Sequence, residues 1–257
     1  NLIIVSKNDI SIKENLTKEL AKLLQDNSFQ SSSILKGLIK KDSLVVLVTP
    51  IDSSAPKGRM ILPQVKVIRD VLDNDAVNIV VKETELEQTL KNLKTYKPDL
   101  VITDSQAFNM VSKIVPQEIS LTSFSILLAK EKGDFDLFLF VTPYIDKLND
   151  GDKVLMLESC THQPTCEDIG RVKLPAWIRK HTGKDIKFEA IAGLTNMEKD
   201  ISDVKMVIQC GGCMATKRQL HNRLLPFVEK GIPVSNYGLT IAYINGIFQR
   251  ATKIFMK

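Results

Sequence analysis

The chain has 257 residues, of which 44% are hydrophobic and 25% are charged, as is typical of a globular protein with one large or two modest domains. The formal charge of +5 is small for this length, and basic residues are interleaved with acidic ones, so nucleic acid is not an expected partner. No apolar run is long enough to span a membrane and no signal peptide opens the sequence, so we expect a cytoplasmic protein that does not contact membranes.

Short β-branched runs alternate with amphipathic helical patterns along most of the chain. Continuous apolar strands between such helices are typical of parallel sheets that are covered on both faces. The predicted fold class is therefore α/β, with two consecutive units whose mainly parallel sheets are covered by helices. The predicted strands are Leu44–Thr49, Val77–Val81, Leu100–Thr103, Ser120–Ser123, Lys153–Leu157, Ile186–Ala190, Met206–Gln209 and Pro233–Val234.

Helical patterns follow most of these strands. One ends at Leu72, one covers Glu83–Leu93, and one opens near Met214. Ser105 is predicted to cap a further helix at its N-terminus, and Gly238–Phe248 is predicted to be the last helix. The turn signal Asn149–Gly151 (NDG) predicts a boundary between a unit at 42–148 and a unit at 149–257.

The first 41 residues have a different pattern. A predicted strand, Leu2–Val5, is followed by Ser6–Asp9 (SKND), which is close to the N-K-x-D motif that reads guanine in GTPases. The phosphate-binding pattern G-x-x-x-x-G-K-[ST] is absent from the sequence, so we expect no GTPase activity from these residues.

The four cysteines all lie in the C-terminal unit. Cys210 and Cys213 form a C-x-x-C pair with two glycines between them, while Cys160 and Cys166 lie upstream. Cys160 and Cys210 each follow a predicted strand, and open α/β sheets place their sites at the carboxyl ends of strands. We therefore expect the thiolates of Cys160, Cys210 and Cys213 to meet at one edge of the second sheet.

Three kinds of site remain compatible with this pattern. An iron–sulfur cluster with three thiolates and one labile position uses all three cysteines. A structural zinc site would take the same cysteines with His162 as the fourth ligand. A dithiol redox or electron-transfer protein would need only Cys210 and Cys213.

Several distinctive stretches occur together in this sequence. They are Leu44–Gln64, Val81–Leu86 (VKETEL), Val101–Phe108 (VITDSQAF), Leu121–Ile126 (LTSFSI), Cys160–His162 (CTH), Asp168–Lys173 (DIGRVK), Cys210–Met214 (CGGCM) and Asn236–Gly238 (NYG). In these stretches and in their order, the chain resembles, over nearly its whole length, the HydF family of proteins that mature iron-iron hydrogenases.

The resemblance implies a domain order and a function. Residues 1–41 would be a remnant of the end of a GTPase domain, 42–148 a dimerisation domain, and 149–257 an iron–sulfur cluster-binding domain. The family is expected to act as a homodimeric scaffold that carries a four-iron four-sulfur (4Fe-4S) cluster. It would accept a diiron cofactor precursor and deliver it to apo iron-iron hydrogenase, with two radical-SAM maturation enzymes as further partners. GTP is expected only as a ligand of the intact family protein.

The resemblance also implies a ligand set. The family motif is C-x-H, a long gap, and H-C-x-x-C, which Cys160, His162, Cys210 and Cys213 match. Position 209 is Gln where the family commonly has His, and an amide is a poor ligand for iron.

The fourth ligand of such a cluster therefore stays open. His162, Glu158 and solvent are all candidates for that position. Cys166 does not belong to the motif, and packing of its side chain at a helix start is the favoured interpretation, although it could serve as a spare thiolate.

Overall fold

The structure is a computed structural model that describes residues 17, 33–51, 58, 60–93, 95–159, 168–194 and 200–256. The SKND segment, Cys160, His162 and Cys166 lie outside these residues. The chain divides into two units, 1–33 and 34–257, and nearly all described residues belong to the second.

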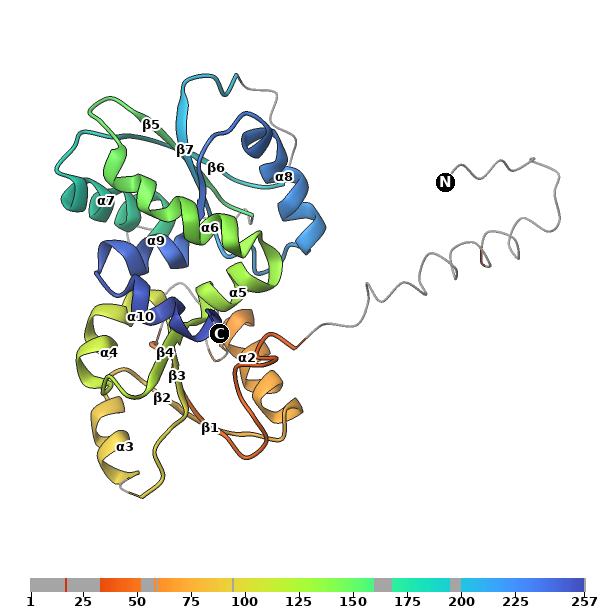
Figure 1. Cartoon of the computed structure of the whole chain (residues 1–257), viewed down its shortest axis with the longest axis vertical. Helices are drawn as coiled ribbons and strands as arrows, with labels where there is room; N and C mark the ends of the chain where they lie inside the picture. Colours follow the sequence, from red (N-terminus) through yellow and green to blue (C-terminus); the bar gives the residue numbers. More distant parts are fainter. Residues whose placement is uncertain are drawn as a thin grey trace. The chain divides into compact units, whose positions relative to one another are not determined.

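Residues from 34 onward contain two four-stranded sheets, in which every described strand pairing is parallel (Figure 1). The first sheet has the order β2-β1-β3-β4. Its strands are β1 (Leu44–Val48), β2 (Val77–Val81), β3 (Leu100–Thr103) and β4 (Ser120–Ser123).

Strand β1, in the middle of the first sheet, is buried on both faces, as its apolar sequence predicted. Val45 and Leu47 of β1 face one hydrophobic core, and Val46 and Val48 face another. Side chains alternate between the two faces of a strand, so a strand that is covered on both sides must be apolar throughout. The helices of this unit are α2 (Leu62–Asp73), α3 (Leu86–Asn92), α4 (Phe108–Ile114) and α5 (Phe124–Lys132).

The second sheet repeats the strand order of the first, as β6-β5-β7-β8. Its strands are β5 (Lys153–Leu157), β6 (Lys187–Ile191), β7 (Val204–Gln209) and β8 (Val234–Asn236). Its helices are α6 (Phe135–Val141), α7 (Leu174–Thr182), α8 (Lys217–Glu229), α9 (Tyr237–Ile244) and α10 (Phe248–Thr252). The predicted α/β fold with two parallel-sheet units is therefore confirmed.

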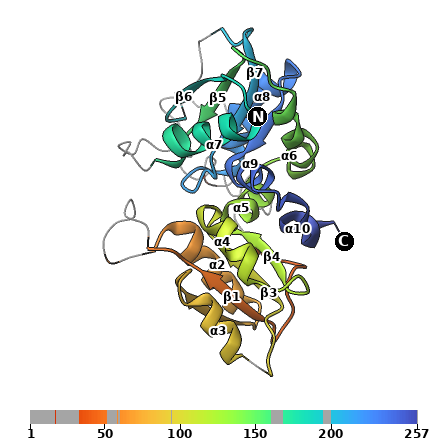
Figure 2. The same ribbon diagram turned by 90° about the vertical axis from the view of Figure 1, so that its left-hand side faces the viewer.

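Helices connect the two sheets. Helix α5 follows β4 directly and contacts α8 and α9, while α10 contacts β4 (Figure 2). Helix α6 contacts β8, and its Phe138 is buried in the core of the second sheet. Within the described residues, no helix is long and apolar enough to cross a membrane.

Two local predictions were wrong. Asp104, not Ser105, is the N-cap of the short helix η1 (Ser105–Ala107), because the Asp104 carboxylate accepts a hydrogen bond from the Gln106 amide. The predicted last helix is interrupted: α9 ends at Ile244 and α10 begins at Phe248. Gly246 lies between them with a φ of 71°, a left-handed conformation that continues no α-helix.

Candidate metal centre

The carboxyl ends of β5 and β7 form the centre of the candidate site. These strands are neighbours, with Leu157 opposite Gln209. The chain places β6 on one side of β5, and β7 and β8 on the other, so β5 and β7 flank the point where the strand order reverses. Open α/β sheets bind ligands at this switch point. The predicted adjacency of the two strands that precede Cys160 and Cys210 is confirmed.

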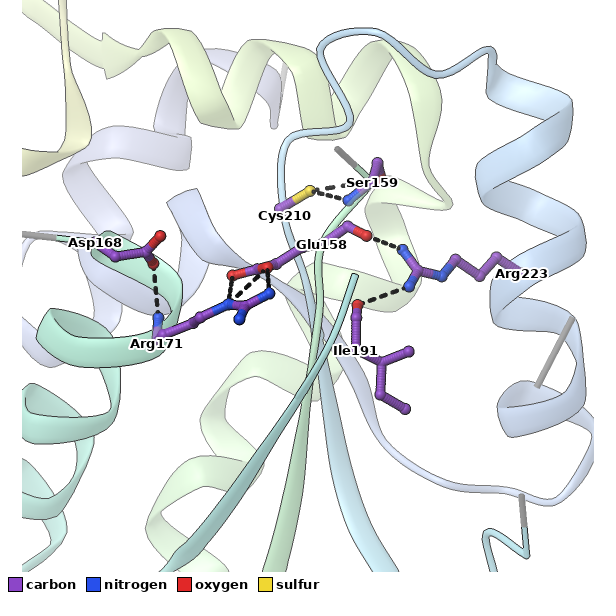
Figure 3. A network of polar contacts seen from close by, with 7 residues as sticks. All are labelled: Glu158, Ser159, Asp168, Arg171, Ile191, Cys210 and Arg223. Atoms are coloured by element: carbon purple, nitrogen blue, oxygen red, sulfur yellow. Dashed lines mark hydrogen bonds and ion pairs between the residues drawn. The ribbon is translucent and has the colours of Figure 1, made fainter. Parts of the chain in front are cut away.

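Cys210 is half-buried, and its sulfur accepts hydrogen bonds from two N–H groups. The backbone N–H of Ser159, beyond the end of β5, donates to Cys210 Sγ at 3.2 Å (Figure 3). The side-chain amide of Gln209, the last residue of β7, donates to the same sulfur at 3.3 Å. The same Gln209 amide donates to Ser159 Oγ at 2.9 Å. N–H groups aimed at sulfur favour a thiolate or a metal-bound thiolate. Gln209 therefore stabilises negative charge on the Cys210 sulfur through its side-chain N–H.

The loop after Cys210 is exposed at Cys213 and buried at Gly212. Gly212 has a φ of 60°, and a Cβ at this position would lie 2.5 Å from Leu220, so only glycine fits. The ammonium group of Lys132, at the end of α5, donates to the carbonyl oxygens of Gly212 and Cys213. Burial lowers the pKa of Lys132, and the nearby Glu131 carboxylate partly offsets that effect.

Glu158 follows β5 directly, and the residue is almost fully buried, with 2% of its surface exposed. Its carboxylate is held by Arg171, whose Nε donates to Oε2 at 3.0 Å and whose Nη2 donates to Oε2 at 2.8 Å (Figure 3). The hydrogen bond with Glu158 raises the pKa of Arg171. An iron ion that bound Glu158 would have to displace this guanidinium group.

Arg171 lies in a five-residue π-helix, η3 (Ile169–Lys173). Asp168 caps this element, since its Oδ1 accepts a hydrogen bond from the Arg171 amide at 2.8 Å. Gly170 packs so closely that a Cβ there would lie 2.3 Å from the Tyr237 hydroxyl and 2.9 Å from Glu158 Oε1. Single π-turns are frequent at functional sites. Here the π-turn carries the guanidinium partner of Glu158.

Arg223 from α8 ties two strand ends together. Its Nη1 donates to the Glu158 carbonyl oxygen at 2.7 Å and its Nη2 to that of Ile191 at 2.9 Å (Figure 3). Glu158 directly follows β5, and Ile191 is the last residue of β6, the neighbouring strand. Burial lowers the pKa of Arg223, which is 7% exposed. Burial also raises the pKa of Tyr237 well above its usual value, so this phenol stays protonated.

Of the predicted site residues, Glu158 and Cys210 lie at the switch point, at the carboxyl ends of β5 and β7. Ser159 and Gln209, which were not predicted as ligands, join the two strand ends there through hydrogen bonds. Among the described residues, no three His, Cys, Asp or Glu side chains form a group that could hold a metal ion. The ligand roles predicted for Cys160, Cys210, Cys213, His162 and Glu158 stay predictions.

Sequence reasoning missed three basic residues that contact this site: Arg171, Arg223 and Lys132. A signal for Arg171 was present, because it belongs to the stretch DIGRVK that carries the family resemblance. Arg223 and Lys132 lie in ordinary helical patterns, where a charged residue indicates a solvent-facing position. Their contacts join residues 65 and 80 positions apart, which no local pattern reveals.

The fold and the site together define a class: an α/β protein of two parallel-sheet units, with the Cys210–Cys213 loop at the switch point of the second sheet. Two family models match the chain, one for the hydrogen maturase F dimerization domain over residues 34–133 and one for the hydrogen maturase F tetramerization domain over residues 136–254. The chain therefore belongs to the hydrogen maturase F family, as its motifs predicted. No curated protein matches the chain.

These matches support a role in hydrogenase maturation and the formation of oligomers. The first matched domain agrees with the expectation of self-association in the first unit. The second match names a tetramerization domain, which was not predicted from the sequence.

Proposed function

We propose that this chain is a scaffold in the maturation of iron-iron hydrogenase, holding a 4Fe-4S cluster through Cys160, Cys210 and Cys213. It accepts a diiron cofactor precursor and delivers it to apo-hydrogenase. The two radical-SAM maturation enzymes are its upstream partners. One observation carries the proposal. The Ser159 amide, immediately before Cys160, donates to Cys210 Sγ at 3.2 Å, so the chain enters the Cys160 segment next to the Cys210 sulfur.

The described donors fit such a cluster. Cys210 Sγ already accepts two N–H groups, and hydrogen bonds to cysteine sulfur tune and stabilise bound iron–sulfur clusters. The two glycines of the CGGC loop permit the close approach of backbone to a ligand. A cluster held by three thiolates leaves one iron position for an exchangeable ligand, which is the chemistry that a carrier needs.

Anaerobic reconstitution with iron and sulfide tests the cysteine assignment. Single Cys→Ser variants at Cys160, Cys210 and Cys213 should each lose the cluster, because a hydroxyl is a poor ligand for iron. Cys166→Ser is the matched control and should keep it. If Cys166→Ser loses the cluster while Cys160→Ser retains it, the assignment is wrong.

Metal analysis of the same preparation separates the competing functions. Iron with equimolar sulfide supports the scaffold. Stoichiometric zinc would indicate a zinc-stapled interaction module instead. A metal-free chain with a titratable disulfide between Cys210 and Cys213 would indicate a dithiol redox protein.

The labile position is tested separately. Added cyanide or imidazole should change the electron paramagnetic resonance spectrum of the reduced cluster, and the cluster should stay bound. His162→Ala should keep the cluster and alter its spectrum. If added ligands have no effect and His162→Ala abolishes binding, four firm protein ligands close the site and the carrier proposal fails.

A further inference from the structure

Lys132 lies at the end of helix α5, which follows the first sheet, and contacts the cysteine loop of the second sheet. Its Nζ donates to three carbonyl oxygens: Gly212 at 2.7 Å, Cys213 at 3.1 Å and Ala215 at 2.9 Å. An ammonium group has three N–H donors, so the loop satisfies all of them. The matched dimerization domain ends at residue 133, whereas the loop lies in the matched tetramerization domain.

The position of Lys132 is fixed by close packing of α5. A Cβ on Gly238 at the start of α9 would lie 2.6 Å from Ser125 Cβ and 2.9 Å from the Ser125 carbonyl carbon, so the two helices meet almost backbone to backbone. Further along α5, a Cβ added at Gly211 would lie 3.4 Å from Leu128 Cδ1, so the loop runs close to this helix. After α5, Gly133 packs against the Phe138 ring. The helix therefore presents Lys132 to the loop from a fixed direction.

We propose that Lys132 is a positioning residue that sets the conformation of the loop between Cys210 and Ala215 and places a positive charge beside its thiols. In a trans peptide, the C=O and the following N–H point in opposite directions. By drawing the carbonyls of Gly212 and Cys213 toward itself, Lys132 turns the N–H groups of Cys213 and Met214 the other way. One side chain thus links the dimerization domain to the cysteine loop.

The loop also borders a cavity that Lys132 helps to form. This cavity has a volume of about 340 Å³, and Cys213, Lys132 and Leu128 line it together with residues of α2 such as Leu62 and Lys66. Because the Lys132 side chain and Cys213 share this cavity, the loop conformation that Lys132 holds also sets how a ligand reaches the exposed thiol.

Hydrogen–deuterium exchange on the metal-free, full-length chain tests the positioning role without any cluster. In Lys132→Met the amides between Cys210 and Thr216 should exchange about tenfold faster, since a tenfold change corresponds to about 1.4 kcal/mol, near the lower limit for a charged hydrogen bond. Lys130→Met is the matched control: it lies two residues earlier on α5, where its Nζ contacts the Phe255 ring, and it should leave the loop unchanged. Amides of β1 report global stability in both variants.

Should Lys132→Met fail to fold, Lys132→Gln gives the same comparison with a smaller loss of polarity. Lys132→Arg should recover part of the protection, because its planar guanidinium keeps the charge but cannot reach three acceptors from one point. Loop exchange equal to wild type in both Lys132→Met and Lys132→Gln would overturn the positioning role.

A second measurement rests on the proposed function, because it needs the reconstituted cluster. Loss of a nearby cation should shift the cluster's reduction potential to more negative values in Lys132→Met and not in Lys130→Met. An unchanged potential would overturn the electrostatic part of the proposal. If wild type binds no cluster but loop exchange still rises in Lys132→Met, the scaffold function fails while the positioning role stands.

Discussion

Removal of the Arg171 guanidinium should destabilise the chain measurably, because it leaves the Glu158 carboxylate buried without its ion-pair partner. The Glu158 side chain is 3% exposed and the Arg171 side chain is 32% exposed. Loss of one partner from a buried ion pair costs about 3–5 kcal/mol. Water can approach from the exposed side of Arg171, so we expect Arg171→Met to lower the free energy of unfolding by about 2–3 kcal/mol.

A double-mutant cycle isolates this interaction. Glu158→Gln removes the charge but keeps an acceptor for Arg171, so it should cost about 1 kcal/mol. The double variant Arg171→Met/Glu158→Gln should be more stable than Arg171→Met alone, because the buried site no longer carries a charge. The expected coupling energy is about 1–2 kcal/mol.

Equilibrium urea unfolding at one fixed protein concentration measures these differences, since oligomer formation makes stability depend on concentration. The control is Arg69→Met, which breaks an ion pair with Asp73 in which both side chains are at least half exposed, and it should give no measurable change. Additive single-variant effects, or an Arg171→Met variant as stable as wild type, would refute the view that the pair supports the strand ends.

Three further outcomes are expected. Gly238→Ala should lower stability by about 1–3 kcal/mol, measured by thermal unfolding, because the added methyl group meets Ser125 of α5 at 2.6 Å; a variant as stable as wild type would contradict this packing. The hydrogen bond to Asp146 raises the pKa of Tyr243 from 10.0 to about 12. The stability that this interaction contributes should therefore be complete below pH 10 and lost as pH rises toward 12. Asp146→Asn should shift the absorbance titration of the Tyr243 phenolate toward 10. An unshifted titration would exclude the Asp146 contact. Light scattering of the full chain at tens of micromolar (about the range of weak association) should report an oligomer, and a monomer would count against it.

Most strands could be predicted from the sequence to within two residues. Val77–Val81 and Lys153–Leu157 match the predicted ranges. For Lys153–Leu157 the reason is burial on both faces, which leaves an apolar run after Lys153, whereas the edge strand Val77–Val81 is partly exposed and is recognised by its β-branched residues. The last helix was predicted to continue to Phe248, but α9 ends at Ile244. Apolar residues resume at Ile247, yet the Asn245–Gly246 pair between them is a turn signal, and the backbone at Gly246 is left-handed.

The candidate site was predictable in its backbone and not in its polar contacts. The C-x-x-C pair and the strand before Cys160 were sufficient to predict the sheet edge, because strand ends of a parallel sheet lie together. The partners of Glu158 are set by tertiary structure: Arg171 reaches it from a π-turn and Arg223 from α8. Ser105 illustrates the same limit, since its hydroxyl donates to Ser123 on the neighbouring strand instead of capping a helix.

The polar contacts of Glu158 and Gln209 bear on the choice of a fourth cluster ligand. The Glu158 carboxylate is paired with Arg171, so its ligation of iron would compete with this ion pair. The Gln209 amide nitrogen donates to Cys210 Sγ and Ser159 Oγ, and an amide oxygen is a poor ligand for iron. If three thiolates hold the cluster, the fourth position therefore falls to His162 or to an exchangeable ligand. The prediction that added imidazole alters the spectrum tests the second of these directly.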